Sequence, residues 1–177
     1  MFKNIASIIN LANLISLLAT ALAIVAILIV KDMALLATFL ITVCFVLDVL
    51  DGAIARKLNL TTNFGKVFDS INDFIIYIIF PLVFFLFFLN QISIELIVIE
   101  IIFVFSGVFR LLRQTHLNFE IEKINYYTGL PVCFNLLLIP VLYLTGPKLI
   151  VLFYLSIFTV SILMISNIKF PKPKIIA

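Results

Sequence analysis

Long apolar runs separated by short polar breaks are the feature that most constrains how this chain can fold. Each run is close to the roughly 20 residues that an α-helix needs to cross the hydrocarbon core of a bilayer. Of the 177 residues, 64% are hydrophobic and 12% are charged, with a mean hydropathy of +1.31. The sequence therefore predicts an all-α integral membrane protein, a single bundle of six transmembrane helices. The expected spans lie near residues 8–30, 33–57, 64–89, 92–114, 128–145 and 148–167.

These runs fill the chain, so we expect a single membrane domain over residues 1–177. There is no internal repeat, which disfavours a transporter built from two similar halves. The first run lacks a small-residue cleavage site after it and is expected to remain as a helix. Cys44 and Cys133 lie in apolar runs without partners at metal-ligand spacing, and we interpret both as packing residues.

The distribution of basic residues predicts the orientation of the bundle. Lys31 and Lys148 fall in loops at one end, and the other ten basic residues fall at the opposite end. Because Lys and Arg are retained on the cytoplasmic side, both termini are expected in the cytoplasm, with the protein in the cell's inner membrane. These residues are spread over short loops, so a nucleic-acid partner is not expected. The ten are Lys3, Arg56, Lys57, Lys66, Arg110, Arg113, Lys123, Lys169, Lys172 and Lys174.

Four of the nine acidic residues lie within one short segment that joins the second and third runs. Asp48 and Asp51 are near the inner end of the second run, and Asp69 and Asp73 are near the inner start of the third. Spacings of three and four residues place each pair on one face of its helix. If the two helices are antiparallel, Asp51 and Asp69 lie at one depth in the membrane and Asp48 and Asp73 lie together at a deeper one.

Four neighbouring carboxylates in a low-dielectric site need cations, since each unpaired charge there costs several kcal/mol. Mg²⁺ and Mn²⁺ prefer carboxylate oxygen, and the cluster contains no His or Cys. Two such ions would balance the four acids and leave capacity for a bridging pyrophosphate, with Arg56 nearby. The alternative, acids paired with Lys or Arg to pack the helices, is disfavoured because these helices carry no basic residues at matching depths.

The whole segment resembles, at every fixed position, the signature of the CDP-alcohol phosphotransferase family. These are membrane enzymes, usually homodimers of six-helix protomers, that make phospholipids at the cytoplasmic face. The resemblance implies that the four aspartates bind two metal ions and that Asp73 also acts as the base. It implies that Gly52, Ala55, Arg56 and Gly65 shape the CDP site, with Asn13 beside the nucleotide. The pattern is Asp48-x2-Asp51-Gly52-x2-Ala55-Arg56-x8-Gly65-x3-Asp69-x3-Asp73.

Segments outside this signature indicate which alcohol accepts the phosphatidyl group. Residues 109–114, 126–132 and 164–173 resemble the corresponding segments of bacterial phosphatidylserine synthases, which implies CDP-diacylglycerol and serine as substrates. Residues 61–66 also resemble phosphatidylglycerophosphate synthases, so glycerol 3-phosphate stays open as the acceptor. A divalent-cation channel or transporter is the alternative from another class. It is disfavoured because the first three runs are almost purely apolar beyond Asp48 and Asp73.

Three other charged or titratable features are candidates. Arg110 and Arg113, one turn apart, could hold an anion such as the lipid phosphate or the serine carboxylate, or could anchor the helix at the interface. Glu100 lies near mid-membrane, where an ionisable group is a functional candidate, although a protonated, packed Glu is equally compatible with the sequence. His116 stands alone in a loop, and catalysis by it is not expected.

Overall fold

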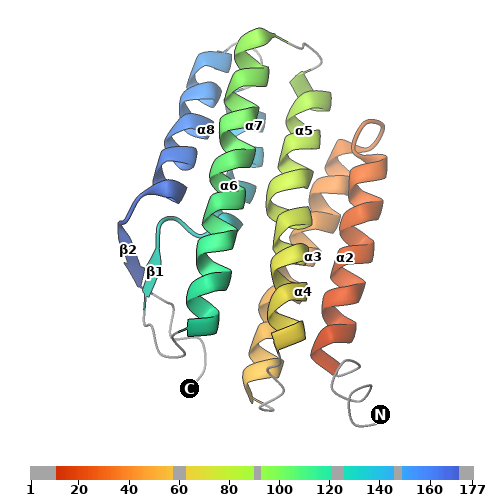
Figure 1. Ribbon diagram of the computed structural model, residues 1–177. Helices are drawn as coiled ribbons and strands as arrows, with labels where there is room; N and C mark the ends of the chain where they lie inside the picture. The colour runs from red at the N-terminus through yellow and green to blue at the C-terminus, as the bar shows by residue number, and fades with distance from the viewer. Residues whose placement is uncertain (1–10, 58–62, 90–92, 121–125, 146–148, 172–177) are drawn as a thin grey trace.

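The computed structural model describes residues 11–57, 63–89, 93–120, 126–145 and 149–171. Within them the chain forms helices that run side by side and alternate in direction, with one short pair of strands at the lower end of the bundle (Figure 1). The elements are α2 (Leu11–Ile29), α3 (Ala34–Lys57), α4 (Asn63–Phe74), the π-helix η1 (Ile75–Ile79), α5 (Phe80–Leu89), α6 (Ile94–Glu120), β1 (Tyr126–Thr128), the 3-10 helix η2 (Val132–Leu137), α7 (Leu138–Thr145), α8 (Ile150–Ile165) and β2 (Lys169–Pro171).

The seam between α2 and α3 is built from small side chains. Small residues let two helices approach closely, and a thiol can then reach the neighbouring backbone. The Sγ atom of Cys44 donates a hydrogen bond to the Ala19 carbonyl at 3.3 Å. This hairpin brings the end of α3 beside the beginning of α2. The fully buried residues of the seam are Ala19, Ala23, Ala26, Ala37 and Cys44.

Helices α4, η1 and α5 form one continuous rod, whose apolar half packs in the centre of the bundle (Figure 1). Phe85 of α5 is fully buried, with its ring edge-on to Phe153 of α8 at 5.0 Å and to Phe103 of α6 at 6.2 Å between ring centroids. Such offset and edge-on aromatic pairs add to the burial of apolar area. The rod therefore ties α6 and α8 to the α2–α3 hairpin.

The outer surface of the bundle is apolar, as a lipid-facing surface would be. Leu28, Leu35 and Leu144 are 73%, 77% and 87% exposed. Two helices, Ala34–Ala55 and Gly65–Leu89, are long and apolar enough to cross a membrane, and three shorter apolar helices accompany them. The predicted helical bundle is thus confirmed, whereas six membrane spans and the cytoplasmic position of both termini stay predictions.

The predicted helical span over residues 128–145 starts too early. Its helical part begins only at Val132, because Gly129 has φ +78 and Pro131 has ψ 139, both outside helical values. The residues before this break pair instead as strand β1 with β2, antiparallel, with Tyr127 opposite Phe170. Alternation of apolar and polar residues was too short here to predict either strand. The two strands close the same end of the bundle at which α3 ends and α4 begins (Figure 1).

Candidate active site

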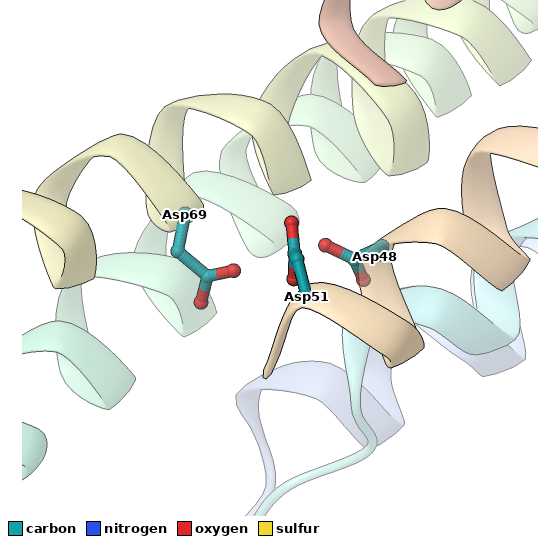
Figure 2. Close-up of side chains that lie close together, drawn as sticks. All are labelled: Asp48, Asp51 and Asp69. Atoms are coloured by element: carbon teal, nitrogen blue, oxygen red, sulfur yellow. The ribbon is translucent and has the colours of Figure 1, made fainter. Parts of the chain in front are cut away.

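Three of the four predicted aspartates meet between α3 and α4. Asp48 and Asp51 lie one turn apart on α3, and Asp69 lies on the facing side of α4, with Asp51 between the other two (Figure 2). One carboxylate oxygen from each residue can be chosen so that all three lie within 4.8 Å of one another. Asp51 is only 3% exposed, and Asp69 is more open to the surface. The structure thus brings together three of the four aspartates that the spacing argument expected in one site.

The donor set of this trio fits a hard divalent cation. It offers only carboxylate oxygen, the ligand that Mg²⁺ and Mn²⁺ prefer. The Oδ1 atom of Asp48 is buried and has no hydrogen-bond partner among the described residues. A buried carboxylate oxygen without a donor is costly, and a cation would remove that cost. The trio could therefore hold a metal ion.

Hydroxyl groups from neighbouring helices hold two of the acids. Ser16 of α2 donates a hydrogen bond to Oδ2 of Asp51, and Tyr77 of η1 donates to Oδ2 of Asp48 at 2.6 Å. Neither residue was predicted from the sequence. The available signals were weak: Ser16 is a polar residue within an apolar run, and Tyr77 follows Asp73 by four residues and so shares its helix face.

Asp73 lies one turn beyond Asp69 on α4 and is not part of the close trio. It is within electrostatic reach of Asp48, Asp51 and Asp69, and also of Arg110 on α6. Asp73 therefore sits where the acids of α3 and α4 meet a cation from a third helix. Asp73 is therefore placed differently from the three acids of the trio.

The predicted CDP-site residues lie at the same end of the bundle. Gly52 and Ala55 are partly buried on α3 after Asp51, and Gly65 is partly buried in the first turn of α4. Asn13 belongs to α2 and Arg56 to α3, but the positions of their side chains lie outside what the structure describes. Their helices nevertheless place them near the acid trio rather than at the far end.

Arg110 and Arg113 differ sharply in what they contact. Arg110 is 2% exposed; its Nε donates to the Leu130 carbonyl at 3.1 Å, and its guanidinium carbon lies 5.6 Å from the centroid of the Tyr127 ring. Its Nη1 has no partner among the described residues. A buried guanidinium nitrogen without an acceptor is suited to an anion. Arg110 thus remains a candidate for an anionic substrate group.

Arg113 instead joins β1 to the end of α8. Its Nη2 donates to the carbonyls of Thr128, Met164 and Ser166, and its Nη1 donates to the carbonyl of Ile165 at 3.2 Å. A guanidinium at a helix C-terminus satisfies carbonyls that have no partner within the helix. We call Arg113 with these four carbonyls the Arg113 clamp. Because its Nη1 and Nη2 atoms donate to the chain itself, we do not assign Arg113 to a substrate.

Glu100 and His116 stand apart from the acid trio. Glu100, ten residues before Arg110 on α6, is 6% exposed, and its Oε1 has no partner among the described residues. It belongs to no metal-ligand cluster found in the described part of the chain. The side chain of His116 falls outside the description. Neither residue is given a role in the proposed reaction.

Comparison with known proteins gives the class of this chain. The family model for CDP-alcohol phosphatidyltransferase matches residues 9–166, which include α3, α4 and the acid trio. The chain therefore belongs to the CDP-alcohol phosphatidyltransferase family, and the resemblance seen in the sequence is confirmed. It is also 35% identical over 137 residues to a CDP-diacylglycerol–serine O-phosphatidyltransferase of Methanocaldococcus jannaschii. That alignment covers 75% of this chain and 62% of the relative, so the chain spans less than two thirds of the relative's length.

Proposed function

We propose that this protein is a CDP-diacylglycerol–serine O-phosphatidyltransferase, which moves the phosphatidyl group from CDP-diacylglycerol to the hydroxyl of serine and releases CMP. The observation that carries this proposal is the trio Asp48, Asp51 and Asp69, whose carboxylates converge in the register of the family signature. The name of the archaeal relative supports serine as the acceptor. The family match also favours an enzyme over a channel or transporter.

In this proposal Asp48, Asp51, Asp69 and Asp73 bind two divalent ions, Mg²⁺ or Mn²⁺. When bound by these carboxylates, the ions would supply positive charge against a pyrophosphate and the departing CMP. Gly52, Ala55, Arg56, Gly65 and Asn13 line the part of the site that takes the CDP group. Gly52 and Gly65 lack side chains, which leaves room for close approach of a ligand.

Asp73 is the proposed general base. Its carboxylate takes the proton from the serine hydroxyl while the serine oxygen forms a bond to the lipid-linked phosphorus. The bond from that phosphorus to the bridging pyrophosphate oxygen breaks, and CMP leaves. Phosphoryl transfer needs mainly positioning and electrostatic stabilisation, which agrees with a site in which carboxylates lie within electrostatic reach of the buried Arg110.

In the proposed site, Arg110 binds an anionic group of one of the two substrates. Its unpartnered Nη1 and its proximity to Asp73 support a role in holding the serine carboxylate or the lipid phosphate. A bidentate or charge-assisted contact of this kind would place the serine hydroxyl near the proposed base. Arg113 is not assigned to substrate binding, because its Nη2 atom donates to backbone carbonyls of the Arg113 clamp.

We further propose a single domain over residues 1–177 that crosses the membrane six times. Both termini and the active site face the cytoplasm, the protein lies in the inner membrane among its lipid substrates, and two copies form a homodimer. Support comes from the sequence, which has ten basic residues in the segments expected at the end that holds the acids and two in those expected at the other end. The alternating direction of the helices agrees with this topology (Figure 1).

The acceptor is tested by incubating purified protein with labelled CDP-diacylglycerol and, in parallel, serine, glycerol 3-phosphate or inositol. CMP release is expected with serine and only when Mg²⁺ or Mn²⁺ is present. Release with glycerol 3-phosphate but not with serine would contradict the acceptor assignment and leave the class intact. Glycerol 3-phosphate remains the second candidate because of residues 61–66, of which 61 and 62 lie outside the described residues.

A further inference from the structure

Tyr77 lies at a point where the rod α4–η1–α5 departs from regular α-helix. Over Ile75–Ile79 the turn is widened, and the Phe80 N–H donates to the carbonyl of Ile75, five residues earlier. Such π-turns are rare and occur often at functional sites. Tyr77 lies within this π-helical turn, four residues after Asp73, and the hydrogen bond from its hydroxyl to Asp48 shows that its side chain faces the acids.

Three contacts hold Tyr77, two of them from α3 and one from η2. Its hydroxyl donates to Oδ2 of Asp48 on α3 at 2.6 Å. Its ring lies edge-on to Phe45 of α3, with centroids 6.4 Å apart. Its backbone carbonyl accepts a hydrogen bond from Nδ2 of the fully buried Asn135 on η2 at 2.9 Å. With only 1% of its surface exposed, the phenol has little freedom to turn away from Asp48.

Asp48 interacts with the side chains of Tyr77 and Asn72, and the phenol of Tyr77 makes the hydrogen bond to its Oδ2 atom. Oδ2 accepts the phenol hydrogen, whereas Oδ1 is buried without a partner among the described residues. A carboxylate held at one oxygen can offer the other to a cation without first losing rotational freedom. Carboxylates that bind metals are commonly held in this way by a hydrogen bond from a neighbouring group.

We propose that Tyr77 is a positioning residue of the metal centre, whose hydroxyl orients Asp48 so that Oδ1 remains available to a divalent ion. The proposal rests on the proposed function in one respect, since it takes Asp48 to be a metal ligand. It adds a residue that the family signature does not contain and that acts through Asp48 rather than on the substrate. If Tyr77 only stabilised the fold, its replacement would lower the stability of the protein equally with and without metal.

The test is a Mn²⁺ titration of purified, detergent-solubilised protein followed by thermal unfolding, with no substrate present. For Tyr77→Phe, the Mn²⁺ concentration that gives half of the stabilisation should rise by roughly tenfold or more, the usual effect of losing such a partner. At saturating Mn²⁺ its CMP release should approach that of the wild type. The matched control is Tyr154→Phe, whose hydroxyl lies 3.4 Å from that of Ser93 at the opposite end of the bundle. This control should leave the Mn²⁺ midpoint unchanged.

An unchanged Mn²⁺ midpoint in Tyr77→Phe, with a lower melting temperature in the absence of metal, would overturn the proposal and leave the proposed function standing. If the wild type itself showed no stabilisation by Mn²⁺, the metal centre would be wrong and the role of Tyr77 with it. Should Tyr77→Phe fail to fold, Phe45→Leu loosens the ring at a partly exposed position and should raise the midpoint in the same direction. No shift in that variant would also overturn the proposal.

Discussion

At the scale of single residues, the four aspartates are not equivalent. Asp51 is the most buried of the close trio and accepts a hydrogen bond from Ser16, whereas Asp48 is held by Tyr77 and keeps Oδ1 without a partner among the described residues. Asp73 lies outside the trio and within electrostatic reach of Arg110. The different surroundings agree with three acids that mainly bind metal and a fourth that also takes a proton.

Replacing Asp73 separates binding from chemistry. Asp73→Asn keeps the size of the side chain but removes the proposed base, so the variant should still bind CDP-diacylglycerol in the presence of metal. Its rate of CMP release should fall by a factor on the order of 10² or more, the usual contribution of general base catalysis. The measurements are a titration with the CDP-lipid and the rate of CMP release across pH.

Asp51→Asn is the matched control for Asp73→Asn, because it makes the same chemical change within the trio. Loss of this buried residue, a proposed metal ligand, should weaken the binding of the CDP-lipid itself. If Asp73→Asn released CMP at nearly the normal rate, or lost binding as fully as Asp51→Asn, the role of Asp73 as the base would be wrong. All four acids would then be better interpreted as metal ligands only.

At the scale of secondary-structure elements, the turn between β1 and η2 connects the Arg113 clamp to Arg110. Gly129 donates its N–H to the Ile168 carbonyl at 2.8 Å, and Leu130 donates to the Leu163 carbonyl at 3.0 Å. The carbonyl of Leu130 in turn accepts from Nε of Arg110. Through this turn, the end of α8 helps to fix the position of the buried Arg110.

Gly129→Ala should disrupt this turn. The backbone there has φ +78, which a side chain disfavours, and an added Cβ would collide with Nη2 of Arg113 and with the Met164 carbonyl. We expect a loss of stability of about 1–3 kcal/mol, seen as a lower melting temperature, together with a raised KM for serine. A variant with wild-type stability and KM would contradict the role of the turn.

Gly107→Ala is the matched control for Gly129→Ala, because it adds the same methyl group to a buried glycine of α6. Its Cβ would meet the end of the Ile78 side chain, with Cδ1 at 2.6 Å, and a flexible side chain can move more readily than backbone. The loss of stability should therefore be smaller, and the KM for serine should stay close to the wild-type value.

At the scale of the whole molecule, the basic residues predict which end of the bundle faces the cytoplasm. In a background with Cys44→Ala and Cys133→Ala, a cysteine added at either terminus should react with a membrane-impermeant reagent only from the cytoplasmic side. Lys31→Cys, in the turn between α2 and α3, should react only from outside. Labelling of either terminus from outside would contradict the topology with both ends in the cytoplasm.

Much of this arrangement could be predicted from the sequence because it follows from local periodicity. The apolar runs indicate helices, and the spacing of Asp48, Asp51 and Asp69 indicates shared helix faces. The remainder depends on contacts between distant segments. The strand β1, the Arg113 clamp and the hydrogen bond from Tyr77 join residues that lie tens of positions apart, and no local pattern indicates them.

The most direct test of the central claim is the identity of the lipid that the whole protein makes when the acceptors compete. Purified protein would receive labelled CDP-diacylglycerol, Mn²⁺ and an equal mixture of serine, glycerol 3-phosphate and inositol, and the labelled lipids would be identified by mass. We expect phosphatidylserine as the main product, formed together with CMP and abolished by a chelator. Phosphatidylglycerophosphate as the main product would contradict serine as the acceptor, and product formation that persists with the chelator would contradict the metal centre.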